Sequence, residues 1–285
     1  MMERALVFRV CDEEALGILH PGDPQAKRGV LILVGGPQYR VGSHRQFLLL
    51  ARHLAANGVP VMRFDYRGMG DSSGQSMSFE QVEDDIAAAM DTFQSEMPEL
   101  DEIIIWGLCD AASAALLYAF RDPRVKGLVL VNPWVRTEQG LAKTYLQHYY
   151  LRRVMSRTFW SDLACGRLNL AASSRSLASM VLQRVRIRVN PSLVQSDADP
   201  SAGQSLPGRM ADGWRRFQGR ILVILSGDDL TAAEFKDMAA SSFAWRGLLD
   251  EPKVCIRELQ EANHTFSRRE WRDQVARWTL DWTQQ

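Results

Sequence analysis

The sequence predicts an α/β fold in which a mainly parallel sheet is covered by helices on both faces. Short apolar runs rich in valine and isoleucine alternate with longer helical patterns, and the connections between the runs are too long for hairpins. The chain has 285 residues, of which 46% are hydrophobic, enough to bury a full core. We therefore expect one large domain or a domain that carries an insertion.

The strand and helix signals begin in the first half of the chain. Residues 30–34 form an uninterrupted apolar strand that ends at Gly35 and Gly36, and Ser43 is a candidate cap for a helix that continues to about Leu54. The later elements predicted here are a strand over 59–66, a helix from a Ser78–Gln81 capping box to about Met97, a strand over 103–108, a helix to Phe120 and a strand over 127–131.

The alternation stops after this strand and resumes near the end of the chain. The predicted elements there are a strand over 220–225, a helix over about 231–245, a strand over 253–259 and a closing helix over about 268–282. We expect a core of residues 1–133 and 216–285, and a helical lid of residues 134–215 inserted over the carboxyl ends of the strands.

The predicted lid is basic, with 12 Lys and Arg against 5 Asp and Glu in a chain whose net charge is zero. A basic lid would favour an anionic or phosphate-bearing small-molecule substrate. The alternative, which we favour, is that these basic residues form a solvent-exposed face with no role in substrate binding. A lid that contacts a membrane surface would need an exposed apolar face near four aromatic residues, but helical spacing favours core positions for them: Tyr145, Tyr149, Tyr150 and Phe159.

Composition excludes several classes of function. The balanced charge suggests no nucleic-acid partner, and no run of 18 or more apolar residues predicts a transmembrane helix. The first ten residues lack the apolar stretch of a signal peptide. The four cysteines show no metal-ligand spacing, and the triad chemistry derived below implies no metal or organic cofactor. Widely spaced cysteines are consistent with a reducing cytoplasm, where one thiol stays free.

The segment around Cys109 is the most informative in the chain. An apolar strand runs into Gly107-Leu108-Cys109-Asp110-Ala111, and an alanine-rich helical pattern follows at once. This is the layout of a nucleophile elbow, with cysteine where serine usually stands. Small residues are needed two positions before and after the nucleophile, because strand and helix backbones crowd there. The alternative is a buried structural cysteine at an ordinary strand–helix junction.

Two later segments favour a catalytic thiol over a buried one. Asp228 and Asp229 follow the strand over 220–225, and His264 follows the next strand. The order nucleophile, acid, histidine is that of a hydrolase triad, and the ends of parallel strands are where such sheets place ligands. The other histidines are expected in loops or helical patterns: His20, His44, His53 and His148.

These positions suggest a role for each residue. His264 and the amino end of the following helix would raise the thiolate fraction of Cys109. Asp229, with Asp228 as the alternative acid, would orient the imidazole.

Backbone groups would form the oxyanion hole. One N–H donor should come from Asp110, whose side chain we expect to point outward or toward the lid. The second donor should be Gly36 or, less favoured, Gln38, because Pro37 has no N–H.

A second serine-type motif is present but lacks the required context. Gly70-Asp71-Ser72-Ser73-Gly74 matches G-x-S-x-G, yet no helix begins after it. Ser72 is therefore interpreted as a loop residue.

Taken together, these motifs resemble the α/β-hydrolase superfamily along nearly the whole chain. The segments that carry the resemblance are Val34-Gly35-Gly36-Pro37, residues 65–72, residues 107–111, Gly227-Asp228-Asp229 and His264. Within the superfamily the chain resembles the exosortase A system-associated hydrolases of type 1, encoded with exopolysaccharide and protein-sorting genes. That resemblance implies the α/β-hydrolase fold and a hydrolase of unsettled substrate.

The chain also departs from the usual serine pattern of the superfamily. Cys109 replaces serine, and Val34 stands where many relatives have histidine. Cysteine also occurs at this position in dienelactone hydrolases, but it puts ordinary peptidase and lipase assignments in doubt. We expect an esterase or thioesterase that acts through a Cys109–His264–Asp229 triad and an acyl-enzyme. An acyltransferase acting on a polysaccharide intermediate and a non-catalytic binding protein of the same fold are the alternatives.

Overall fold

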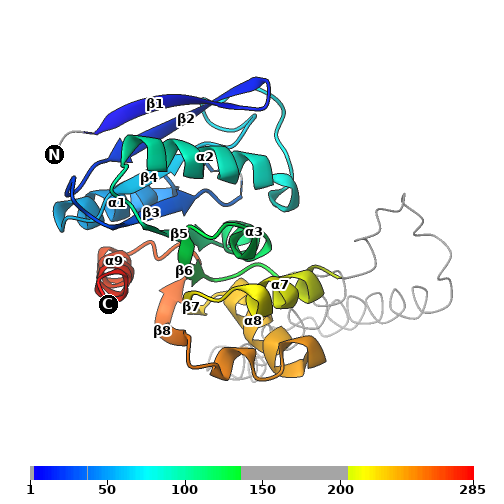
Figure 1. Cartoon of the computed structure of the whole chain (residues 1–285). Helices are drawn as coiled ribbons and strands as arrows, with labels where there is room; N and C mark the ends of the chain where they lie inside the picture. Colours follow the sequence, from blue (N-terminus) through cyan, green and yellow to red (C-terminus); the bar gives the residue numbers. More distant parts are fainter. Residues whose placement is uncertain (1–2, 37, 136–204) are drawn as a thin grey trace, which may run out of the picture. The chain divides into compact units, whose positions relative to one another are not determined.

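The predicted mainly parallel sheet with helices on both faces is confirmed by the computed structural model, which describes residues 3–36, 38–135 and 205–285 (Figure 1). The strands are β1 (Arg4–Val10), β2 (Glu13–His20), β3 (Arg28–Leu33), β4 (Val61–Phe64), β5 (Glu102–Leu108), β6 (Val125–Val131), β7 (Arg220–Asp228) and β8 (Val254–Asn263). They form one eight-stranded sheet in the order β1-β2-β4-β3-β5-β6-β7-β8. Pairing is parallel from β4 to β8, whereas β1 pairs antiparallel with β2 and β2 with β4.

Helices cover both faces of this sheet in the described part of the chain. They are α1 (Gln46–Ala56), α2 (Glu83–Glu96), α3 (Asp110–Tyr118), α7 (Leu206–Arg216), α8 (Leu230–Ser241) and α9 (Arg269–Thr283). Helices α1 and α9 contact each other on one face, where Phe47 packs edge-on against Trp106 of β5. Helices α2, α3 and α7 lie on the other face (Figure 1). Burial on both faces explains why the central strands are continuous apolar runs: Val30, Leu31, Ile32 and Leu33 are fully buried.

The β1–β2 hairpin was not predicted, because its strands carry a weak signal. In β1 only Leu6, Phe8 and Val10 are buried, and the residues between them are exposed. The two-residue turn at Cys11 and Asp12 contains neither glycine nor asparagine, and Cys11 adopts a φ of 53°. The strand is therefore recognisable only through its pairing with β2.

The boundary of the inserted segment differs from the predicted one. By its contacts the chain divides into residues 1–141 with 206–285, and a second unit of residues 142–205. Helix α7, assigned to the lid by its sequence, belongs to the first unit because Met210, Ala211 and Trp214 are buried in its core. The ring of Trp214 lies 5.3 Å from that of Trp245. An amphipathic pattern shows that a helix buries one face, but not which surface that face covers.

Candidate active site

The backbone at Cys109 has the strained geometry of a nucleophile elbow. Cys109 lies between β5 and α3 with φ 63° and ψ −124°, a conformation that non-glycine residues rarely adopt. Two hydrogen bonds hold it there: its N–H donates to the Val131 carbonyl at 2.9 Å, and its carbonyl accepts from the Trp134 N–H at 3.1 Å. The thiol is free and half-buried. The strain is maintained by the neighbouring strand β6 and the loop after it.

Gly107 allows strand and helix to approach each other at this turn. A Cβ atom added at Gly107 would lie 2.6 Å from both the carbonyl carbon and the oxygen of Ala111. Such distances do not occur between real Cβ atoms and backbone, so a side chain here would push α3 away from β5. The small residue at this position is thus a requirement of the local packing.

His264 and Asp229 are brought together from the ends of neighbouring strands β8 and β7. The Nδ1 atom of His264 lies 2.7 Å from Oδ2 of Asp229, whose side chain is only 8% exposed. The Asp229 carboxylate also accepts from the N–H groups of Thr231 and Ala232 at 3.1 and 3.2 Å and so caps α8. Asp228, the alternative acid, is exposed. The imidazole contact is therefore made by Asp229.

The surroundings of His264 favour its protonated form. Burial by itself lowers the pKa of the imidazole, but hydrogen bonds to Asp229 and to the Cys109 thiol outweigh it. Together with the charges of these two groups, they raise the pKa of His264 to about 10. Because this value lies above the ordinary 6.5, protonation stabilises the fold below about pH 6.5, and that stabilisation is lost as the pH rises toward 10. The contacts of His264 with Asp229 and Cys109 therefore favour an imidazolium at this position.

Removing the charge of Asp229 is expected to lower the pKa of His264. In Asp229→Asn, burial would still lower the pKa of His264. The hydrogen bond that raises this pKa would be weaker, and the carboxylate charge would be absent. The measurement is an NMR titration of the His264 ring, assigned by comparison with His264→Ala. The exposed neighbour gives the control, because Asp228→Asn should leave the titration near its original pH. An unchanged titration in Asp229→Asn would show that the contact does not form in solution.

Asn132, which was not predicted from the sequence, connects β7 to the loop that carries His264. This buried residue follows β6 with φ 45°. Its amide nitrogen donates to Ser226 Oγ at 2.8 Å and to the His264 carbonyl at 3.0 Å, and its Oδ1 accepts from the Ser226 N–H at 2.9 Å. The Val-Asn-Pro sequence at a strand end was its only signal. Asn132 is a positioning residue, since it touches the His264 backbone rather than the imidazole.

Asn132→Ala is expected to lower the free energy of unfolding by about 1–3 kcal/mol, because buried partners lose their hydrogen bonds. It should also slow alkylation of Cys109 near neutral pH, since the His264 loop loses an anchor. Ser226→Ala is the matched comparison: it removes one contact to Asn132 but leaves the His264 carbonyl contact intact. If both variants slow alkylation equally, Asn132 acts only through general stability.

The backbone donors expected for an oxyanion hole are engaged by groups of the chain itself. The Gly36 N–H donates to Oδ1 of Asp110 at 2.7 Å, and the Gln38 N–H donates to the Gly36 carbonyl at 2.8 Å. The Asp110 side chain therefore points inward to Gly36, contrary to the outward direction expected from the sequence. That expectation was wrong because Gly35 leaves room for the carboxylate: a Cβ there would lie 2.6 Å from Asp110 Oδ1.

Ser72 is a structural residue, as its sequence context indicated. Its hydroxyl donates to the Asp65 carbonyl at 2.8 Å and accepts from the Leu16 N–H at 3.0 Å. The buried Asp65 carboxylate accepts from the N–H groups of Arg40 at 2.6 Å and Asp71 at 3.1 Å. The conspicuous segment 65–72 thus ties the loop after β3, which carries Gly36, to the loop after β4.

The remaining histidines lie apart from this site where the structure describes them. His20 was expected in a loop or helix but lies in β2, fully buried, where its Nε2 accepts from the Nε of Arg63 at 3.0 Å. His44 and His53 belong to the 3-10 turn Ser43–Arg45 and to α1. His148 and the four aromatic residues of the predicted lid lie outside the described residues.

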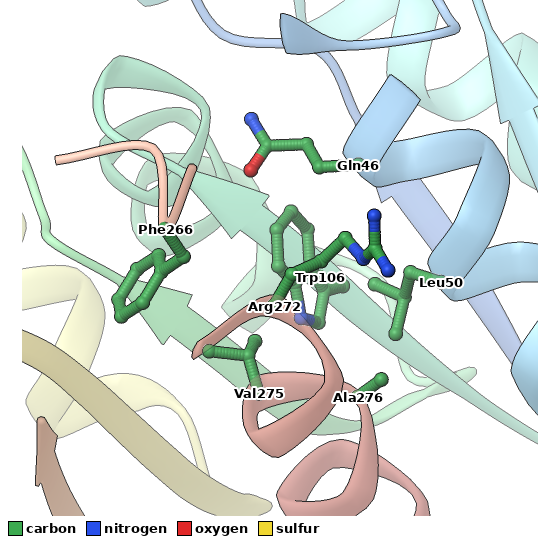
Figure 2. Close-up of a pocket in the computed structure, with 7 residues that line it drawn as sticks. All are labelled: Gln46, Leu50, Trp106, Phe266, Arg272, Val275 and Ala276. Atoms are coloured by element: carbon green, nitrogen blue, oxygen red, sulfur yellow. The ribbon is translucent and has the colours of Figure 1, made fainter. Parts of the chain in front are cut away.

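A small cavity lies behind the His264 loop, on the face of the sheet covered by α1 and α9. Figure 2 shows the residues that line it: Gln46, Leu50, Trp106, Phe266, Arg272, Val275 and Ala276. The buried Trp106 Nε1 and Gln46 Nε2 atoms have no hydrogen-bond partner among the described residues. With a volume of about 20 Å³, the cavity suits one water molecule and not an acyl group.

Two kinds of feature are absent from the described ranges. No helix in them is long and apolar enough to span a membrane. They contain no cluster of three or more histidine, cysteine, aspartate or glutamate side chains able to hold a metal ion.

Comparison with known proteins identifies a family for this chain. Residues 25–229 match the family described as serine aminopeptidase, S33. The acyltransferase drtE of Aspergillus calidoustus is 32% identical over 114 residues, which are 38% of this chain and 36% of that protein. The chain thus matches little more than a third of this relative's length.

Solved structures show the same fold. The Pyrococcus furiosus esterase Pf2001 is similar with a TM-score of 0.62 and 15% identity, over 99% of this chain and 93% of the esterase. The α/β-hydrolase GrgF of a Penicillium species has a TM-score of 0.62 and 16% identity, over 100% and 98% of the two chains. Because its family match spans more than half of its length, the chain belongs to the S33 family of α/β-hydrolases.

Proposed function

We propose that this α/β-hydrolase cleaves acyl esters or thioesters with Cys109 as nucleophile, His264 as proton carrier and Asp229 as the acid that orients it. The observation that carries the proposal is the combination of Cys109 on a strained elbow with an imidazole that contacts Asp229 at 2.7 Å and whose pKa both Asp229 and the Cys109 thiol raise. A buried structural cysteine would need neither the strain nor the histidine.

The proposed reaction has two steps. The Cys109 thiolate attacks the acyl carbonyl carbon, forming a C–S bond as the C=O electron pair moves to oxygen. The bond to the leaving alcohol or thiol then breaks, and that group takes the proton of His264 Nε2. Neutral His264 next accepts a proton from water, whose oxygen attacks the thioester and releases the Cys109 thiolate. Asp229 keeps Nδ1 of His264 engaged throughout, so that Nε2 faces the reacting atoms.

The same acyl-enzyme supports acyl transfer as a second function. An alcohol can take the place of water in the second step, and the partial relative drtE carries the name acyltransferase. The exosortase-associated subfamily, a polysaccharide acceptor, an anionic substrate and a cytoplasmic location belong to this proposal as sequence-based expectations. The serine chemistry in the family's description does not transfer directly, because the elbow residue here is cysteine.

The test is intact-mass labelling with iodoacetamide between pH 5 and 9, followed by peptide mapping. The exposed Cys11 and half-buried Cys255 serve as internal reference thiols. We expect Cys109 to label fastest, the fast phase to disappear in Cys109→Ser, and the rate near neutral pH to fall in His264→Ala. If Cys109 labels no faster than Cys11, and its labelling rate is unchanged in His264→Ala, the chain is better explained as a binding protein.

Substrate class is tested on the same protein. A p-nitrophenyl ester and an S-acyl thioester should release product with an initial burst, and an aminoacyl p-nitroanilide should not. Added alcohol separates the two functions, because an acyltransferase would form a new ester in place of the free acid. Cleavage of the anilide alone would support the peptidase chemistry of the family's description instead.

A further inference from the structure

The Asp110 carboxylate occupies the place where a reacting acyl oxygen would be held. Its Oδ1 atom accepts from the Gly36 N–H at 2.7 Å and from the Ala111 N–H at 2.9 Å, and the N–H of Asp110 itself also donates to the carboxylate. Gly36 and Asp110 are the two residues whose N–H groups are expected, from the sequence, to hold the oxyanion. Both donors therefore point at an anionic oxygen that the chain supplies.

The loop after β3 is shaped to admit this carboxylate. A Cβ atom at Gly35 would lie 2.6 Å from Asp110 Oδ1 and 2.3 Å from the Leu108 carbonyl oxygen. Glycine at position 35 is thus compatible with an Asp110 side chain turned toward the loop after β3, and a larger residue is not. The contact is built into the packing between the loop after β3 and the start of α3.

The surroundings of Asp110 have opposing effects on its pKa. Burial raises the pKa of its carboxyl group, while the Gly36 and Ala111 N–H groups and the charge of His264 lower it, with a net rise. Burial also raises the pKa of Tyr66, and the charge of Asp110 adds to that rise. The Tyr66 hydroxyl has no hydrogen-bond partner among the described residues. Burial therefore opposes the anionic form of Asp110, whereas the backbone N–H groups and the charge of His264 stabilise it.

We propose that Asp110 is a built-in occupant of the oxyanion hole, which the acyl carbonyl must displace before Cys109 can be acylated. The proposal rests on the proposed function. When the C–S bond forms, the negative charge moves to the former carbonyl oxygen. That oxygen cannot share two N–H donors with a carboxylate, because two negative charges would lie side by side at a partly buried position. Asp110 must rotate away or take up a proton, and it selects for substrates that can displace it.

The test compares two reactions of the same thiol. Acylation by p-nitrophenyl acetate develops an oxyanion, whereas alkylation by iodoacetamide does not, so the ratio of the two rates cancels changes in the thiol itself. We expect this ratio to rise about tenfold or more in Asp110→Ala, the effect of freeing donors from a charged acceptor. Asp110→Asn should give a smaller rise, because its amide oxygen still accepts from Gly36 but carries no charge. The wild-type ratio should also rise as the pH falls and Asp110 is protonated, and the ratio in Asp110→Ala should not.

An unchanged or lower ratio in both variants would overturn the proposal while leaving the proposed function intact. If Asp110→Ala does not fold, the rate ratio in Asp110→Asn still tests the proposal, because the asparagine side chain has the same shape as aspartate. If no protein is acylated although Cys109 is alkylated, the proposed function fails, and the Gly36 amide resonance becomes the readout. A pH titration of that resonance in the wild type, absent in Asp110→Asn, would support the occupied hole. A resonance that does not titrate would overturn it.

Discussion

Cys109→Ser is expected to hydrolyse acyl esters about 10² to 10⁴ times more slowly than the wild type at pH 7, although serine is the usual residue of this family. A serine hydroxyl attacks only with a neutral base beside it, and such a base contributes about this factor. In this site burial opposes protonation of His264, but Asp229 and Cys109 outweigh it and raise the pKa to about 10. Serine would keep the Asp229 contact, so a substantial share of the imidazole would remain protonated and unable to accept the proton.

Stopped-flow kinetics with p-nitrophenyl acetate between pH 6 and 10 provide the measurement. The rate of the serine variant should climb with pH as His264 loses its proton, whereas the wild type should react at lower pH. Cys109→Ala should show neither burst nor turnover, and Cys255→Ser supplies the control for loss of a thiol outside the site. A serine variant as fast as the wild type at pH 7 would mean that His264 is neutral there.

Gly107→Val is expected to lower the free energy of unfolding by about 3 kcal/mol or more and to abolish turnover. The added Cβ would lie 2.6 Å from backbone atoms of Ala111, and backbone cannot yield as a flexible side chain would. Helix α3 would have to shift, moving both the thiol and the Asp110 N–H. Urea unfolding and Cys109 alkylation measure the two effects.

Gly247→Ala provides the comparison for this substitution. Gly247 has a φ of 77° and open space around its Cβ direction, so an added methyl there tests backbone strain without a clash. We expect a loss of only about 1–2 kcal/mol in that variant. Equal losses in the two variants would show that close packing at Gly107 is not the source of the effect.

Most of the sheet could be predicted because its central strands are buried on both faces. Such strands are short, continuous apolar runs, so β3 and β5 stand out without any tertiary information. The β1–β2 hairpin and helix α7 did not stand out in this way. One face of β1 remains exposed, and α7 is assigned to the core only through its contacts with α3 and Trp245.

The candidate site was likewise predictable from the sequence only in part. Chain order and strand ends alone led to Cys109, His264 and the Asp228–Asp229 pair, because the carboxyl ends of parallel strands meet at one edge of a sheet. Choosing between the two acids required the structure, since adjacent residues at a strand end point in different directions. Asn132 was missed because its partners are far away along the chain: Ser226 is separated from it by 94 positions and His264 by 132.

The fold class, the tight turn at Cys109 and the chain order of Cys109, Asp229 and His264 were thus predictable from the sequence, since each depends on local pattern and on the periodicity of burial. The direction of the Asp110 carboxylate was decided only by the tertiary structure. A side chain at the start of a helix can rotate toward solvent or toward the sheet, and no local pattern distinguishes the two. The Gly36 N–H from a distant loop, and the space that Gly35 leaves, determine where the charge lies.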